Sequence, residues 1–334
     1  MKKWMKWIGI LLASLVGLVV LGLIGATVGA LSLYKRQWNE PQWNEAGAEI
    51  HASSDSAVIA RGRYLVYASA HCADCHTPDA SREAMFRGEE VPLTGGTGEI
   101  TFLGSWTAPN LTADTVTGIG NMSDAQFARL IRHGINRENR IALPFKDAYA
   151  DMAEEDLVAI LSYLRTLPPA PGIGPDKKIN LLGMITLAYF LEPYGPAQTP
   201  RAAFKPEATV EYGDYLANTV GRCESCHTPR NLKTGEFLGA PLSGGMPFKS
   251  RLQPGMMFVT PNLTPDSATG HIAHWSEELF VQRMRAGAVF ADSPMPWGSY
   301  RRMTDTDLRA LYRYLQSLKP VRHEVGAPLQ PEKA

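Results

Sequence analysis

The residues of this sequence that could do chemistry are its four cysteines, which fall into two copies of one pattern, C-x-x-C-H. On a helical turn, positions i and i+3 share a face, so the two thiols of one copy can add to the two vinyl groups of a haem. The histidine that follows can then reach the iron from the same side as its proximal ligand. The pattern predicts two covalently attached haem c groups, held by Cys72, Cys75 and His76 in the first copy and by Cys223, Cys226 and His227 in the second.

Three other uses of paired cysteines explain less. A four-cysteine zinc site would leave unexplained the histidine that follows each pair. A thioredoxin-like redox pair needs a βαβ context, which the helical, loop-rich pattern around both motifs lacks. Disulfides within each pair would account neither for the histidines nor for their repetition. With 4 Cys in 334 residues, the chain is also not a disulfide scaffold.

The motif lies within a longer unit that the chain contains twice, which we place at residues 55–170 and 207–322. GRYLV near the start of the first unit becomes GDYLA in the second, and PNLTADTVTG becomes PNLTPDSATG. Self-similarity over this length indicates two homologous domains of ordinary size. Residues 171–206 form the linker between them.

Both units are predicted to be mostly helical with long loops. In the first, Ser123 and Gln126 form a capping box, and Gly134 provides a left-handed stop for the helix that they begin. The acidic run at 154–156 is expected to be the first turn of the last helix. That helix has its apolar residues at one-face spacing in both units, namely Leu157, Ile160, Leu161 and Leu164, and Leu308, Leu311, Leu315 and Leu318.

Composition excludes some functions. The chain has 33 basic and 33 acidic side chains and a net charge of zero. Without a cluster of lysine and arginine it lacks the positive surface that a nucleic-acid binder needs. The sequence also contains no phosphate-binding loop, dinucleotide fingerprint or nucleophile constellation.

An uncharged apolar run at residues 7–34 is long enough, as a helix, to cross the roughly 30 Å hydrocarbon core of a bilayer. It is longer than the apolar core of a cleaved signal peptide, so we expect residues 1–36 to be an uncleaved membrane anchor. Four tryptophans flank the run and are expected at the two water interfaces: Trp4, Trp7, Trp38 and Trp43. Basic residues lie on both sides of the run and orient it only weakly.

The linker contains a second apolar stretch, at residues 179–191. A helix of this length cannot span a bilayer, which needs about 20 residues. We favour a short helix buried between the two domains. The alternative is an interfacial helix that lies on the membrane.

Together, these motifs resemble those of class I cytochromes c. Each unit has a glycine and a tyrosine in its first helix, then C-x-x-C-H, the PNLTxDxxTG loop and a tyrosine in its last helix; these residues are Gly62, Tyr64 and Tyr163, and Gly213, Tyr215 and Tyr314. The resemblance covers nearly all of the chain outside the anchor and linker. It implies a mostly α fold of two tandem class I cytochrome c domains behind one N-terminal transmembrane helix. It also implies that the first and last helices of each domain cross at these small and aromatic residues.

The resemblance also indicates the sixth iron ligand in the second unit. SPMPWGSYRRMTDTDL, which contains Met295 between two prolines, is similar to the segment that supplies the distal methionine in diheme cytochrome c subunits of periplasmic dehydrogenases. The prolines would stiffen an extended loop that presents the thioether. Met303 matches Met152 just before the last helix, where packing is the simpler role.

The first unit departs from this pattern, because Leu143 stands where Met295 stands in the second. Leucine cannot ligate iron. The candidates for this position are His133, Met122, Met152 and Lys146, or the position is open. The sequence leaves these alternatives undecided.

The resemblance implies a diheme c-type cytochrome, an electron carrier rather than an enzyme in its own right, that passes electrons from a periplasmic dehydrogenase to the respiratory chain. It further implies haem attachment on the periplasmic side, which places the protein in the cell inner membrane as a single-pass chain with both haem domains in the periplasm. The alternative is a haem enzyme, peroxidase-like or thiosulfate-oxidising, with an atypical or open sixth position at the first haem.

Overall fold

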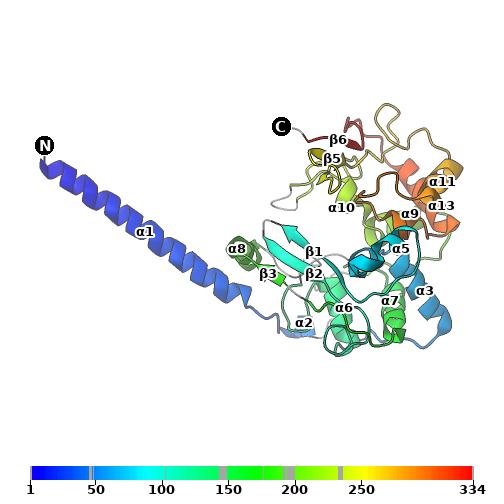
Figure 1. The fold of residues 1–334 in the computed structure, drawn as a ribbon, viewed down its shortest axis with the longest axis horizontal. Helices are drawn as coiled ribbons and strands as arrows, with labels where there is room; N and C mark the ends of the chain where they lie inside the picture. Colours follow the sequence, from blue (N-terminus) through cyan, green and yellow to red (C-terminus); the bar gives the residue numbers. More distant parts are fainter. Residues whose placement is uncertain are drawn as a thin grey trace.

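The protein is described here by a computed structural model, which covers residues 2–44, 47, 49–101, 103–142, 149–175, 177–190, 193, 200–231 and 236–332. It is mostly helical, as predicted. A long helix, α1 (Lys2–Tyr34), projects from a body in which the helices of the first repeat lie on one side and those of the second repeat on the other (Figure 1). By length and composition, α1 could cross a membrane from Lys6 to Leu33.

The remaining elements follow the repeat. After α2 (Pro41–Asn44), the first repeat contains α3 (Ser56–Tyr67), α4 (Ala73–His76), the 3-10 turn η1 (Asp79–Ser81), α5 (Arg82–Phe86), β1 (Gly96–Thr101), β2 (Gly104–Ala108), α6 (Asp124–His133) and α7 (Glu154–Thr166). The linker contains β3 (Lys177–Ile179) and α8 (Leu181–Phe190). The second repeat contains α9 (Val210–Asp214), the π-helical turn η2 (Tyr215–Val220), α10 (Cys223–His227), β4 (Pro247–Lys249), β5 (Met256–Val259), α11 (Glu277–Ala286), α12 (Trp297–Tyr300) and α13 (Asp305–Ser317), followed by β6 (Leu329–Pro331).

The local signals in the first repeat are confirmed. Ser123 and Gln126 form the reciprocal capping box at the start of α6, and Gly134 ends that helix at a φ of 65°. The acidic run at 154–156 occupies the first turn of α7.

Two small antiparallel sheets were not predicted. They have the strand orders β1-β2-β3 and β4-β5-β6. In each, one edge strand comes from outside the repeat as we placed it, because β3 belongs to the linker and β6 follows residue 322. Strands of three or four residues carry too little alternation of apolar and polar positions to be recognised in a sequence.

The first and last helices of each repeat cross at the predicted glycines. A Cβ on Gly62 of α3 would lie 1.8 Å from the carbonyl oxygen of Ala159 in α7. A Cβ on Gly213 of α9 would lie 2.0 Å from the carbonyl oxygen of Ala310 in α13. Glycine is therefore required at both crossings, because a methyl group would push the two backbones apart.

We expect Gly62→Ala to destabilise the protein by about 1–3 kcal/mol or more, the cost of overpacking a close contact that cannot relax. The obstacle is backbone rather than a flexible side chain. The control is Gly174→Ala, whose Cβ would meet its nearest atom at 3.9 Å. The measurement is denaturant unfolding of the purified protein, and equal stability of the two variants would contradict the close crossing.

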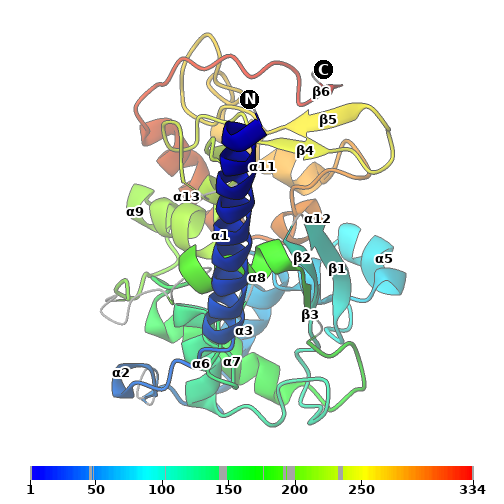
Figure 2. The same ribbon diagram turned by 90° about the vertical axis from the view of Figure 1, so that its left-hand side faces the viewer.

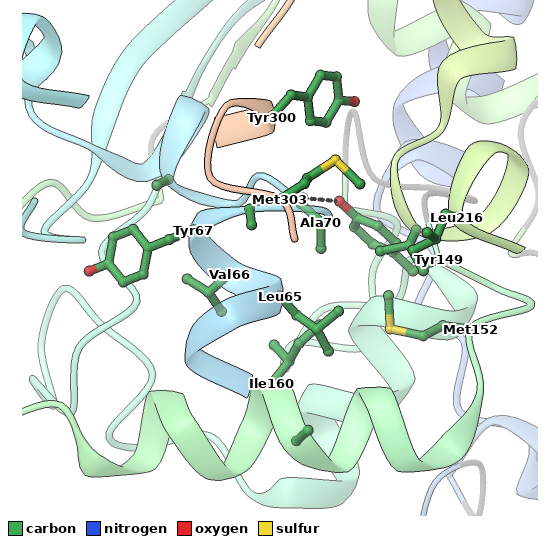
Figure 3. Close-up of a cluster of buried hydrophobic side chains, with 14 of the residues drawn as sticks. Leu65, Val66, Tyr67, Ala70, Tyr149, Met152, Ile160, Leu216, Tyr300 and Met303 are labelled. Carbon is green, nitrogen blue, oxygen red and sulfur yellow. Dashed lines mark hydrogen bonds between the residues drawn. The ribbon is translucent and has the colours of Figure 1, made fainter. Parts of the chain in front are cut away.

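The buried apolar residues of both repeats form one continuous cluster. Figure 3 shows Leu65 and Val66 of α3 above Ile160 of α7, with Leu216 of the second repeat nearby. The two repeats are thus packed into a single body rather than strung on a flexible linker.

The tryptophans that flank the apolar run separate into two pairs. Trp4 and Trp7 are exposed on α1, as expected of residues at a membrane interface. Trp38 and Trp43 are instead buried in a small cluster with Ile135 of the first repeat, so the prediction that they face a water interface is wrong. They attach the chain that follows α1 to the first repeat.

The helix in the linker is also placed differently from our expectation. α8 is not buried between the repeats but lies against the C-terminal part of α1 (Figures 1 and 2). The Tyr189 hydroxyl donates to the Ala26 carbonyl at 3.3 Å. Leu181 and Leu182, at 50% and 52% exposure, face away from the protein.

Candidate haem attachment sites

The first C-x-x-C-H motif forms the predicted turn. α4 begins directly after Cys72, so both thiols and the His76 imidazole lie on one helical turn. The buried His76 holds its Nδ1 2.6 Å from the carbonyl oxygen of Pro109. Because a carbonyl can only accept, Nδ1 carries the proton and Nε2 carries the lone pair that a metal requires.

The second motif repeats this geometry. Cys223, Cys226 and His227 lie on α10, and Nδ1 of His227 is 3.1 Å from the carbonyl oxygen of Pro261. Burial lowers the pKa of His227 to about 4, so its imidazole is neutral. Burial also lowers the pKa of His76. The two sets of donors would fit a covalently attached haem equally well, each with an oriented imidazole that could ligate the iron.

The surroundings of the cysteines do not suit a redox pair or a shared zinc site. None of the four is in a disulfide. Burial raises the pKa of Cys72 and of Cys223 to about 12, whereas a redox C-x-x-C pair needs a depressed pKa and a thiolate. Among the described residues, no group of three or more potential metal-ligating side chains is assembled, so the two pairs do not meet in one four-cysteine site.

The repeated PNLT loop supplies the carbonyl oxygens that orient both histidines. Asn110 in the first loop is buried and donates to the carbonyl of Ala170 at 2.7 Å. Asn262 in the second is buried and donates to the carbonyl of Val321 at 2.8 Å. Each loop is therefore tied to the segment that follows the last helix of its repeat. From the sequence, this loop marks the repeat and the resemblance to class I cytochromes c, but its contact with the histidine of each motif was not predicted.

Met295 lies in the turn that precedes α12 and is partly buried against the core. Its carbonyl accepts from the amide of Trp297 at 2.7 Å, and the guanidinium of Arg283 lies 4.2 Å from the centre of the Trp297 ring. These contacts of Trp297 hold the loop on the C-terminal side of Met295. Such support suits a ligand whose thioether must keep one position.

The candidates for the sixth ligand of the first haem differ in their surroundings. Leu143 and Lys146 lie outside the described residues. Met152 is fully buried in the apolar cluster that the two repeats share, so it contributes to the core (Figure 3). His133 is buried in the last turn of α6, with its ring centre 5.7 Å from that of Trp43.

Reciprocal hydrogen bonds join the two repeats. The Tyr64 hydroxyl of the first repeat donates to Asp307 at 2.6 Å, and the equivalent Tyr215 of the second donates to Asp156 at 2.8 Å. Asp156 also accepts two bonds from Arg61, at 2.8 and 3.0 Å. Burial and the neighbouring carboxylates raise the pKa of both tyrosines, so they remain neutral donors. We expected the acidic run to stabilise only the start of its own helix and did not foresee this role of Asp156.

The turns that lead into the two motifs also touch. His71, directly before Cys72, turns toward the second repeat, where its ring centre lies 5.5 Å from that of Tyr300 and its imidazole hydrogen-bonds the Gly221 backbone. The Gly221 carbonyl also accepts from the Tyr300 hydroxyl at 2.8 Å. His71 and the equivalent Arg222 have positive φ, 43° and 51°, which non-glycine residues rarely adopt. Both repeats therefore use the same unusual turn where they meet.

A further contact joins the first motif to the segment after Met295. The Ser299 hydroxyl donates to the Asp74 carboxylate, which lies between the two cysteines of the first motif. A Cβ on the neighbouring Gly298 would lie 2.3 Å from the carbonyl oxygen of Met85. Helix α12 is therefore packed on the attachment region of the first repeat as well as being part of the second.

Several known proteins are similar to this chain. A diheme cytochrome c-type of Cereibacter sphaeroides is 30% identical over 276 residues, which cover 78% of this chain and 86% of that protein. The gluconate 2-dehydrogenase cytochrome c subunit of Pantoea cypripedii is 27% identical over 279 residues, 79% of this chain. The fructose dehydrogenase cytochrome subunit of Gluconobacter japonicus is 35% identical over 112 residues, 32% of this chain.

The chain does not extend over the whole of each relative. The matched region covers 60% of the gluconate 2-dehydrogenase cytochrome and 22% of the fructose dehydrogenase cytochrome. No protein-family model matches the chain.

Proposed function

This chain belongs to the family of diheme c-type cytochromes and cytochrome c subunits of dehydrogenases, and we propose that it carries electrons from a periplasmic dehydrogenase to the respiratory chain. The observation that carries the proposal is the duplicated turn in which two thiols and one oriented imidazole lie together. A haem attached there supplies one-electron exchange.

In this proposal each repeat attaches one haem c. Cys72 and Cys75 bind the first and Cys223 and Cys226 the second, with His76 and His227 as proximal ligands. The carbonyls of the two PNLT loops keep both imidazoles in the ligating tautomer.

Met295 is proposed as the distal ligand of the second haem, whereas the first repeat has Leu143 at the matching position. A methionine and histidine pair raises the haem potential. The two sites would then differ in potential and form a graded relay. The contact between the turns at His71 and Gly221 supports electron exchange within one body.

The same proposal places the protein in the membrane. α1 is uncharged between Trp7 and Tyr34 and is exposed along most of its length, as a helix surrounded by lipid would be. Both repeats would then lie in the periplasm, with α1 holding them near a membrane-bound electron acceptor.

The test is reduction of the purified full-length protein. We expect two covalent haems per chain by haem assay and intact mass, rapid reduction by a partner dehydrogenase that co-purifies through the anchor, and no turnover of small substrates by the chain alone. Sustained catalysis by the isolated chain would contradict the proposal.

Binding of carbon monoxide or cyanide distinguishes the proposed electron carrier from the alternative, a haem enzyme. The replacement of the expected methionine by Leu143 is the observation that favours a haem enzyme with an open first site. Rapid binding of carbon monoxide or cyanide at one haem would support that alternative. Slow or absent binding at both haems is expected for an electron carrier.

A further inference from the structure

Helix α8 has an apolar surface that the protein leaves uncovered. The stretch at 179–191 contains no charged residue. Leu181, Leu182 and Tyr189 are about half exposed, although they belong to a ten-residue helix that is almost entirely apolar. Such a helix would normally bury these side chains against protein or lipid.

The position of α8 is set by contacts on two sides. On one side, a Cβ on Gly183 would lie 2.2 Å from the carbonyl oxygen of Leu103, between strands β1 and β2 of the first repeat. On the other, Tyr189 reaches α1, where a Cβ on Gly29 would lie 2.6 Å from its hydroxyl oxygen. α8 is therefore wedged between the first repeat and α1 and is held by both (Figures 1 and 2).

The part of α1 that α8 covers lies inside the apolar span. Ala30 is the one described residue of α1 that is fully buried, and Tyr189 bonds the carbonyl of Ala26. The span runs to Leu33. At 1.5 Å per residue, Ala26 lies roughly 10 Å inward from Leu33 along the helix. If the span lies within the bilayer as far as Leu33, an element in contact with Ala26 therefore lies below the bilayer surface.

We propose that α8 is a second membrane element, which inserts beside the C-terminal end of α1 into the leaflet on the haem side and contacts lipid acyl chains through Leu181, Leu182 and Tyr189. This rests on α1 being a membrane anchor, as proposed above. The exposed Lys178 just before the helix is placed to meet lipid headgroups. Because α8 also packs on the β1–β2 connection, its insertion would hold the first repeat against the membrane instead of leaving both repeats free to swing on α1.

The test uses spin labels on single introduced cysteines in the full-length protein with its haems attached, reconstituted in vesicles of phosphatidylethanolamine and phosphatidylglycerol. Leu182→Cys reports on α8, Val20→Cys on the middle of α1, and Val289→Cys on an apolar residue of the second repeat that is 69% exposed. Collision of each label with oxygen and with a water-soluble nickel complex is measured by power saturation. Unchanged haem absorption shows that each variant is folded.

We expect the labels at positions 182 and 20 to be several-fold less accessible to nickel than the label at 289, and more accessible to oxygen. The label at 182 could instead be as accessible to nickel as the label at 289 while the label at 20 is shielded by lipid. That result would show that α8 does not insert, and it would still support α1 as a membrane anchor. If the label at 20 is also in water, the anchor itself is wrong. Shielding of all three labels from nickel would likewise overturn the inference, because the result would not distinguish α8 from the second repeat.

Discussion

Met295→Leu is expected to lower the midpoint potential of the haem that we propose is attached at Cys223 and Cys226. A thioether ligand stabilises ferrous iron relative to ferric iron, so its loss favours the oxidised state. The change should be a sizeable part of the roughly 0.8 V range that axial ligands control. Leucine has nearly the same volume as methionine, so the loop before α12 should keep its packing.

The measurement is a spectroelectrochemical titration of both haems. The matched control is Met303→Leu, because Met303 is buried in the core just before α13 and is expected only to pack. The control should leave both potentials nearly unchanged. Met295→Leu should also make one haem bind carbon monoxide rapidly. If both substitutions shift the potentials alike, or neither does, the assignment of Met295 is wrong.

Asp156→Ala is expected to destabilise the protein by up to about 3–5 kcal/mol, the cost of removing one partner from a fully buried ion pair, because Asp156 is buried and Arg61 is only partly exposed. The substitution leaves the guanidinium of Arg61 without its carboxylate and the hydroxyl of Tyr215 without its acceptor. Because Tyr215 belongs to the other repeat, the loss acts on the contact between the repeats as well as on α7.

The measurement is the free energy of unfolding in denaturant, with the haems attached. Glu89→Ala is the matched control, since its ion pair with Arg87 is solvent-exposed on both sides and such pairs contribute about 1 kcal/mol or less. A loss for Asp156→Ala no larger than that of the control would show that the reciprocal bonds do not hold the repeats together.

Two carboxylates, Asp156 and Asp307, accept the hydrogen bonds that connect the two repeats. Asp156 binds both Arg61 and Tyr215, whereas Asp307 accepts from Tyr64. Together with the contact of His71 and Tyr300, these bonds keep the two attachment turns at one separation. If each turn attaches a haem, as proposed, the same bonds would also fix the distance between the two haems.

The helical turns of the two C-x-x-C-H motifs and the apolar span could be predicted from the sequence because each depends on neighbouring residues. The repeat could be found because its two copies can be aligned. Two thiols and a histidine must lie on one helical turn to hold one haem. Their spacing is therefore visible within five consecutive residues of the sequence. The prediction that the first and last helices of each repeat cross at Gly62 and Gly213 was also correct. It came from the resemblance to class I cytochromes c, in which these two helices cross.

The tertiary structure alone decided what depends on residues far apart in the chain. The carbonyls of Pro109 and Pro261 meet the histidines, Asp156 meets Tyr215 across the repeats, and α8 meets α1 rather than the space between the domains. Local periodicity describes which face of an element is apolar, but not which distant element covers it. That choice follows from packing the whole chain at once, where burial and hydrogen bonding are satisfied between segments that the sequence does not place side by side.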